Sequence, residues 1–555
     1  MKNETWRTRA FTVAALLIGS ACASDPEQVG QAAITAEYLH PVMERLSSDE
    51  FEGRAPSSTG EQTTIAYLRN EFRMLGIQPG NGSEFFQEVP LVTMTVNGSP
   101  TLRISGRGQT NELAYREDHV VWTKRVAQQA SLENSEMVFV GYGIVAPEYD
   151  WDDYEGLDVA GKTVVVLVND PGFATQDSAL FNGNTMTYYG RWTYKYEEAA
   201  RQGAAGAIVV HETEPAGYGW GTVASSWTGP QFDLVRADSN MSRVAVEGWV
   251  TVAAARDIFT RADQDYDALK SRAQTRDFAA VPLGVNATVS FENTVRRSIS
   301  NNVLGVLPGS DRADEYVVYM AHWDHFGRDP SLEGDQIYNG ALDNASGTAG
   351  LLALARAFAA LDEPPSRSVL FLAVTAEEFG LLGSAYYAQN PVHPRNQTVA
   401  AINLDGLNLH GPMNDITVIG RGMSELDDYL ESAAQEQGRI VRSDPEPEKG
   451  FYYRSDHFSF AKEGIPALYT DAGIDHVEHG SSWTLEQRED YTANRYHKPS
   501  DEYDPDWDVS GAVDDLQLMF LVGYRIANSS DFPNWREGTE FKATRDAQMR
   551  GSGGQ

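Results

Sequence analysis

Ser368-Val-Leu-Phe-Leu-Ala-Val-Thr-Ala-Glu-Glu378 runs from an uninterrupted apolar segment directly into a pair of carboxylates. An apolar run of this length is typical of a strand that is buried on both faces of an α/β sheet. Ligands of such sheets bind beyond the carboxyl ends of the strands. Because Glu377 and Glu378 follow a strand of this kind, they are expected at the functional edge of the sheet.

Two further apolar runs end in the same way. The run Glu315-Tyr-Val-Val-Tyr-Met-Ala321 is followed by His322, and the run Val399-Ala-Ala-Ile-Asn-Leu404 is followed by Asp405. If all three runs are strands of one sheet, their ends converge on a single hydrophilic cluster of His, Asp and Glu.

The side chains of this cluster indicate a metal site. Imidazole and carboxylate groups without a thiolate suit zinc, with Mn²⁺ or Co²⁺ as substitutes. A carboxylate can bridge two cations, and a two-metal site can activate water and polarise a carbonyl. Neighbouring residues at a strand end point in different directions, so one of Glu377 and Glu378 can bind metal while the other takes a proton. An isolated Glu-Glu pair would be a solvated surface pair, but this pair follows a buried strand.

Several segments together resemble metallopeptidase family 28, the co-catalytic dizinc aminopeptidases, whose relatives include glutamate carboxypeptidases and glutaminyl cyclases. The resemblance covers about Asn301 to Val522. The elements that carry it are His322-x-Asp324, Asp343-Asn-Ala-Ser-Gly347, Glu377-Glu-x-Gly-Leu-Leu-Gly-Ser384, Asn403-Leu-Asp405, Arg454-Ser-Asp-His-x-x-Phe460, Gly464-Ile-Pro466 and Tyr496-His497. It implies an α/β fold of the zinc exopeptidase (phosphorylase/hydrolase-like) type, with helices flanking a mixed central sheet of roughly eight strands.

The resemblance also implies a role for each matching residue. His322 and Asp405 would hold one Zn²⁺, Glu378 and His497 the other, and Asp343 would bridge both. Glu377 would be the general base and acid, Asp324 would orient the ring of His322, and Tyr496 would help to stabilise the oxyanion or simply pack beside the site. The peptide bond after Asp343 would be cis. The nearby His325, His457, His476 and His479 match no ligand position and are expected to be hydrogen-bonded or solvent-facing.

The chain is too long for one core, so two or more domains are expected. Helical spacing between Thr35 and Gln78 flanks a Glu52-Gly-Arg54 turn, which resembles the opening of secreted family members and is expected to pack on the catalytic sheet. The segment from Glu197 to Val210 resembles the protease-associated domain, a small β-rich module without a catalytic cluster. The predicted division is an N-terminal part of the catalytic domain at 30–134, an inserted protease-associated domain at 135–290, the peptidase domain at 291–530 and a C-terminal tail at 531–555.

Composition excludes some partners. A hydrophobic fraction of 41% is that of a globular protein, and the formal charge of −35 argues against nucleic acid, whose phosphates it would repel. Peptides are the substrates that the resemblance to metallopeptidase family 28 implies. The sequence does not determine the oligomeric state.

The N-terminus has the pattern of a secretory signal over residues 1–22, with basic residues before an apolar run. Ala21-Cys-Ala23 fits ordinary release, whereas Gly19-Ser-Ala-Cys22 resembles a bacterial lipobox, although Gly19 replaces the usual leucine. Since Cys22 is the only cysteine, lipidation at Cys22 is favoured. The protein would then be located in the periplasm or cell envelope. With one cysteine, no disulfide can form within one chain. The alternative is a secreted protein.

The leading prediction is therefore an exported dizinc aminopeptidase. The alternatives are a glutamate-carboxypeptidase-like exopeptidase, a one-metal glutaminyl cyclase, and a non-catalytic binding module with a dead site. The last two would each lack part of the ligand or base set, and none of it is missing from this sequence.

Overall fold

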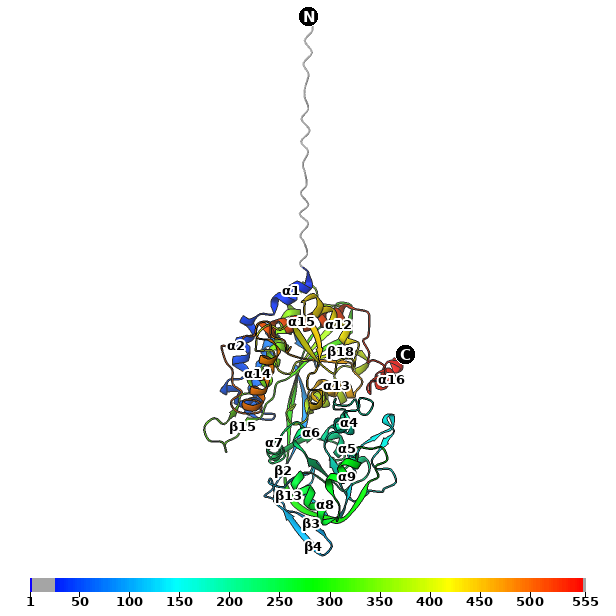
Figure 1. Cartoon of the computed structure of the whole chain (residues 1–555). Coiled ribbons are helices and arrows are strands. Elements are labelled where there is room, and N and C mark those ends of the chain that lie inside the picture. The colour runs from blue at the N-terminus through cyan, green and yellow to red at the C-terminus, as the bar shows by residue number, and fades with distance from the viewer. Residues whose placement is uncertain (2–24, 553–555) are drawn as a thin grey trace.

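The computed structural model describes residue 1 and residues 25–552, and it forms two packed units connected by two long strands (Figure 1). The predicted signal segment, with Cys22, lies outside the described residues. Among residues 25–552, no helix combines the length and the apolar character needed to cross a membrane.

The larger unit is built on a mixed sheet, which confirms the predicted fold class. Neighbouring strands follow the order β2-β13-β17-β14-β18-β21-β19-β20, with β1 and β11 added beside β13 and β2. The bounds are β1 (Gln78–Pro79), β2 (Phe86–Val96), β11 (Pro230–Leu234), β13 (Val281–Leu307), β14 (Arg312–His322), β17 (Arg367–Val374), β18 (Thr398–Asn403), β19 (Asp415–Ile419), β20 (Ile440–Ser443) and β21 (Ala467–Asp471).

The three predicted apolar runs are the central strands β14, β17 and β18. Strands β17 and β18 lie parallel to β14 on its two sides, and every residue of both is buried. Helices cover both faces of such a sheet, which explains why these sequences show no alternation of apolar and polar residues.

The helices of the larger unit flank this sheet (Figure 1). Their bounds are α1 (Pro26–Ala33), α2 (Ala36–Leu46), α3 (Thr59–Met74), α10 (Gly347–Ala359), α11 (Leu382–Gln389), α12 (Leu426–Glu436), α13 (His457–Lys462), α14 (Gly480–Asn494), α15 (Ser510–Asn528) and α16 (Lys542–Ser552). Leu39 of α2 and Phe72 of α3 share one buried cluster with Phe371 of β17. The N-terminal helices therefore pack on the sheet, as the sequence predicts.

The inserted unit has a mixed sheet of its own, in the order β4-β3-β13-β6-β9-β10-β12-β5. Its strands are β3 (Leu102–Gly106), β4 (Gln109–Leu113), β5 (His119–Trp122), β6 (Gln129–Phe139), β9 (Thr163–Leu167), β10 (Gly206–His211), β12 (Val246–Thr251) and the first part of β13. Its helices are α4 (Pro171–Thr175), α5 (Trp192–Arg201), α6 (Thr213–Ala216), α7 (Trp220–Ser226), α8 (Val252–Arg261) and α9 (Tyr266–Arg272). Two further pairs of two-residue strands form small separate sheets. They are β7 (Val145–Ala146) with β8 (Trp151–Asp152), and β15 (Gly327–Arg328) with β16 (Ile337–Tyr338).

Strand pairing shifts the expected boundary of the inserted unit. Strand β3 pairs with residues 286–288 of β13, and β5 pairs with β12, so residues 102–122 belong to this second sheet. The sequence division at residue 135 therefore lies too late. The segment 102–134 has no motif of its own, and only its hydrogen-bonding partners, which lie about 130 to 180 residues away, decide its place.

The segment 531–552 also differs from the expected tail. Trp535 is 1% exposed and its indole N–H donates to the Gly464 carbonyl at 2.9 Å. Arg545 of α16 is equally buried and donates to the Thr398 carbonyl at 2.9 Å. This segment is thus a packed part of the larger unit.

Phe72 tests how α3 is held on the sheet. Its ring lies 6.4 Å from that of Phe85 and 6.2 Å from that of Phe371, and the side chain is fully buried. Phe72→Ala is expected to lower the free energy of unfolding by about 3–5 kcal/mol, because it removes buried contacts and leaves a cavity. Urea denaturation measures this. The matched control on the same helix is Met74→Ala, since Met74 is 72% exposed; equal losses for the two variants would contradict the packing.

Candidate metal centre

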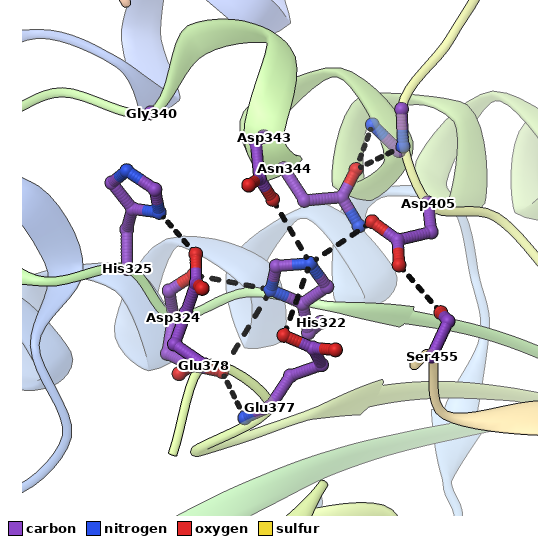
Figure 2. A network of polar contacts seen from close by, with 12 residues as sticks. His322, Asp324, His325, Gly340, Asp343, Asn344, Glu377, Glu378, Asp405 and Ser455 are labelled. Atoms are coloured by element: carbon purple, nitrogen blue, oxygen red, sulfur yellow. Dashed lines mark hydrogen bonds and ion pairs between the residues drawn. The ribbon is translucent and has the colours of Figure 1, made fainter. Parts of the chain in front are cut away.

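The central parallel strands end level with one another, and this brings the predicted site residues together. In the register of the sheet, His322 pairs with Val374 of β17 and Met320 pairs with Asn403 of β18. His322 therefore lies at the end of β14, at the same edge of the sheet as the residues that follow β17 and β18. These residues include Glu377 and Asp405. Figure 2 shows these side chains converging on the imidazole of His322.

Asp343 lies between two histidines. One of its carboxylate oxygens is 3.3 Å from His322 Nε2, and the other is 3.2 Å from His497 Nε2. On the first side, His322 Nε2 is also 3.2 Å from Asp405 Oδ1. On the second side, His497 Nε2 is 3.1 Å from Glu378 Oε2. The five predicted ligands thus form two groups that share Asp343.

The loop after β17 separates the directions of its two glutamates. Ala376 has a left-handed backbone with φ of 54°, which is uncommon outside glycine and typical of functional sites. The Glu377 N–H donates to Asp324 Oδ1 at 3.1 Å, and Glu377 Oε2 is 4.0 Å from His322 Nε2. A side chain at Gly383 would meet the Thr375 carbonyl at 2.2 Å, so the loop can close only over a glycine. Glu377 therefore faces the first group while Glu378 faces the second.

Asn344 explains the rest of the Asp-Asn-Ala-Ser-Gly motif. Its side-chain oxygen accepts hydrogen bonds from the N–H groups of Gly347 and Gly406 at 2.9 and 3.0 Å, and its amide donates to the Leu404 carbonyl at 3.0 Å. A Cβ at Gly347 would lie 2.2 Å from that oxygen. The motif therefore ties the segment carrying Asp343 to the loop carrying Asp405. The Asp343–Asn344 peptide bond is cis, as the resemblance implies.

Three residues that support the predicted ligands have no role implied by the sequence motifs. Ser455 donates to Asp405 Oδ2 at 2.5 Å, and His325 Nδ1 lies 2.5 Å from Glu378 Oε1. Asp501 accepts from the N–H groups of Leu342 and Asp343 at 3.2 and 3.1 Å. Ser455 lies inside a recognised motif and His325 directly follows another, so both could have been suspected, whereas nothing in the sequence marks Asp501.

Arg54, from the predicted Glu-Gly-Arg turn, supports the site from behind. It is 1% exposed and donates to the carbonyls of Trp323, Leu46, Asn339 and Gly340 at 2.6 to 2.9 Å. Burial lowers the pKa of its guanidinium to about 10, and the surrounding carboxylates oppose this. The N-terminal turn thus fixes the loops on both sides of the metal-binding cluster.

The remaining predicted residues lie as follows. The Asp324 carboxylate is 3.9 Å from His322 Nδ1, while its main-chain carbonyl is closer, at 3.2 Å. The Tyr496 ring stacks on His497 with centroids 3.8 Å apart. His457 is fully buried, and His476 and His479 stack on each other at 4.6 Å.

The site has an excess of buried negative charge. Burial raises the pKa of Glu377, and Asp405 and Glu378 add to this, so it lies well above its usual range despite His322. Burial lowers the pKa of His322, but Glu377 and Asp405 outweigh it and hold that pKa well above the usual range. Burial also raises the pKa of Asp324 to about 8 and that of Asp456 to about 7. Both Asp456 oxygens and Asp324 Oδ2 are buried without a hydrogen-bond partner. Such a cluster is stable only with additional positive charge.

The donor set fits zinc. Two ligands of one tetrahedral zinc ion, each at about 2.0–2.1 Å, lie roughly 3.3–3.4 Å apart. The atoms of the two groups around Asp343 are 3.1 to 3.3 Å apart. Donor atoms of His322, Asp343 and Glu378 also lie within 4.8 Å of one another, as in a metal-binding cluster.

Comparison with known proteins also points to a metallopeptidase for this part of the chain. Residues 302–521 match the family model described as Peptidase family M28. This segment is a peptidase family M28 domain. The matched range contains β14, β17, β18 and every residue of the two groups around Asp343.

Curated relatives of the M28 domain include peptidases of two kinds. The "Aminopeptidase NAALADL1" of Mus musculus is 36% identical over 129 residues, which are 22% of this chain and 16% of that protein. The "Probable glutamate carboxypeptidase AMP1" of Arabidopsis thaliana is 32% identical over 121 residues, 21% of this chain and 16% of that protein. The chain thus matches about 16% of the length of these relatives.

A solved structure resembles the chain over most of its length. The "Aminopeptidase from Aneurinibacillus sp. strain AM-1" has a TM-score of 0.51 at 20% identity, covering 91% of this chain and 97% of that one. This likeness concerns the fold.

Asp501→Asn tests the support of the segment that carries Asp343. The variant keeps the shape of the side chain but removes the charge that accepts both amides, so zinc affinity should fall about 10- to 100-fold. Competition with a chromophoric chelator measures it. Asp506→Asn, at an exposed position, is the control, and unchanged affinity in Asp501→Asn would contradict the assigned support.

Proposed function

We propose that this protein is a dizinc aminopeptidase that hydrolyses the first peptide bond of peptides with a free N-terminus. The observation that carries the proposal is the sharing of Asp343 by two groups of donors, with a further carboxylate, Glu377, beside them. The relatives named aminopeptidase support the choice of reaction.

In this proposal His322 and Asp405 would hold one zinc ion, Glu378 and His497 would hold the other, and Asp343 would serve both. Mn²⁺ or Co²⁺ could replace zinc, because the donors are imidazole and carboxylate. Zinc bound here supplies Lewis acidity, which polarises a carbonyl and makes water more acidic.

Glu377 moves the proton in this reaction. A carboxylate oxygen of Glu377 accepts a proton from the attacking water and then gives it to the leaving amine nitrogen. The side chain is suited to this role because it is 9% exposed and its backbone N–H is held by Asp324. The negative charges of Asp405 and Glu378 raise the pKa of Glu377, so its carboxylate takes up a proton more readily. Tyr496, stacked on His497, would donate its hydroxyl proton toward the developing oxyanion.

A glutamate carboxypeptidase of the same fold is the second candidate, because one relative carries that name and the reaction needs the same donors. A glutaminyl cyclase needs only one metal, and a non-catalytic module needs no base, so the complete set of side chains favours neither. Export with a lipid on Cys22 remains part of the proposal and is supported by the sequence pattern of residues 1–22.

A peptide panel decides between the two exopeptidase reactions. The zinc-loaded protein should hydrolyse peptides with a free N-terminus and leave N-acetylated peptides of the same sequence intact. Removal of metal by a chelator should abolish hydrolysis, and added zinc should restore it. Cleavage of acetylated peptides at their C-terminal residue would instead identify a carboxypeptidase.

Glu377→Gln separates the base from the metal ligands. It keeps size and shape but removes the basic oxygen, so kcat should fall on the order of 10²–10⁴-fold with normal metal content. Glu378→Gln should lower metal occupancy, because Glu378 is a proposed ligand. Kinetics beside elemental analysis measure both effects, and Glu363→Gln, exposed before β17, is the control. A metal-loaded Glu377→Gln protein with near-full activity would refute the mechanism.

A further inference from the structure

The inserted unit has a cavity of about 410 Å³, and its lining residues lie between His211 and Lys270, outside the residues assigned to the metal centre. His211 and Thr251, which end the neighbouring parallel strands β10 and β12, both line it. Ligands of open α/β sheets bind beyond the carboxyl ends of their strands. Small-molecule sites usually have volumes of about 300–1,000 Å³. Position and size therefore fit a small ligand bound by the inserted unit itself.

His211 gives this cavity a hydrogen-bond acceptor. The side chain is only 4% exposed, and its Nε2 lies 2.9 Å from the Tyr218 carbonyl oxygen. A carbonyl oxygen can only accept, so Nε2 carries the hydrogen. Burial lowers the pKa of His211, although the Tyr218 carbonyl and Glu212 oppose this, and the neutral ring keeps a lone pair on Nδ1. Within residues 25–552, His211 Nδ1 has no hydrogen-bond partner. Such an atom indicates a partner that the protein itself does not supply.

Two cationic side chains also line the cavity, Arg256 from α8 and Lys270 from α9. Arg256 Nη2 lies 2.9 Å from Asp267 Oδ1, and the Lys270 ammonium pairs with Glu212. Glu212 lines the cavity as well and accepts from the Tyr266 hydroxyl at 2.5 Å. Because a guanidinium has five N–H donors and an ammonium has three, both cations keep donors for a further anion.

Helix α8 and an indole complete the lining. Thr251 caps the helix, since its hydroxyl oxygen accepts from the Ala254 N–H at 3.1 Å, and Val252 at the first helical position lines the cavity. The first N–H groups of a helix have no partner within it and favour negative charge. The Trp220 ring, with its centroid 5.6 Å from that of His211, adds an apolar surface. The cavity thus combines donors for an anion, an acceptor for a donor and an apolar wall.

We propose that this cavity of the inserted unit binds a free α-amino acid. The carboxylate of the amino acid would pair with Arg256 and Lys270 beside the start of α8. Its ammonium group would donate to His211 Nδ1 and to Glu212, and its side chain would lie against Trp220. A carboxylate without an ammonium group would leave His211 Nδ1 unpaired, and an amine without a carboxylate would face the two cations. The inference goes beyond the proposed peptidase reaction, which would release molecules of this class.

The test compares three small molecules with the same side chain. Leucine carries an ammonium group and a carboxylate, leucinamide lacks the carboxylate, and 4-methylpentanoate lacks the ammonium group. Calorimetric titration of the zinc-loaded full chain should give a Kd for leucine about 10- to 100-fold below those of the two analogues, as expected when one charged hydrogen-bonding group is lost. Equal affinities for all three molecules, or no saturable binding of leucine, would overturn the proposal.

Variants assign the binding to the cavity. Arg256→Gln removes the charge of an exposed side chain, and His211→Gln keeps a donor for the Tyr218 carbonyl while it removes the acceptor Nδ1. Each should weaken leucine binding about 10-fold or more, and thermal unfolding checks that the buried His211→Gln variant is folded. Arg272→Gln, at an exposed position of α9 outside the lining, is the matched control and should bind leucine normally. Unchanged leucine affinity in either folded variant would contradict the assigned contacts and overturn the proposal.

A further variant separates the cavity from the metal centre, where leucine could bind as a product of the proposed reaction. Glu378→Gln removes a proposed metal ligand and should leave leucine binding in the cavity unchanged. Leucine binding that disappears in Glu378→Gln and persists in Arg256→Gln would place the amino acid at the metal centre and overturn the proposal. If the protein hydrolyses no peptide but its leucine binding is lost in Arg256→Gln, the proposed reaction is wrong and the cavity site stands.

Discussion

The concentration of largely buried carboxylates at one edge of the sheet is the constraint on which the rest of this structure depends. Asp343, Glu377, Glu378 and Asp405 lie within a few ångströms of two imidazoles. Mutual repulsion and lost hydration would separate these groups in a flexible chain. The protein holds them by attaching each one to a rigid element, so that the energy needed to bring them together is supplied by folding.

The supporting contacts follow from this constraint. Asn344 joins the Asp343 and Asp405 segments, Asp324 holds the Glu377 amide, and Arg54 binds the carbonyls of the loops behind them. Backbone groups are the main partners in all three cases, so the loops are positioned before any side chain meets a metal. A scaffold of this kind keeps the donor atoms at the spacing that metal ligands need.

The inserted unit is connected to the candidate metal centre by a shared strand and by side-chain contacts. Strand β13 belongs to both sheets. The ring of Phe232 in β11 lies 4.4 Å, centroid to centroid, from the ring of Phe379, which follows Glu377 and Glu378 in the chain. On the other side, the Met186 N–H donates to the Pro447 carbonyl, and the Tyr188 ring packs against Tyr453 in the loop that leads to Ser455. The unit therefore flanks the candidate metal centre through two contacts.

The sequence by itself determined the central strands and the residues at their ends, because buried parallel strands need continuous apolar runs and metal sites need particular donor types. It also indicated the mixed sheet and the packing of the N-terminal helices, such as Phe72 on Phe371. Only the tertiary structure decided that residues 102–122 belong to the inserted sheet, that the segment around Trp535 is packed, and that Asp501, His325 and Ser455 support the ligands. The physical reason is that strand pairing and hydrogen bonding between distant segments depend on positions in space, and these leave no local pattern of residues.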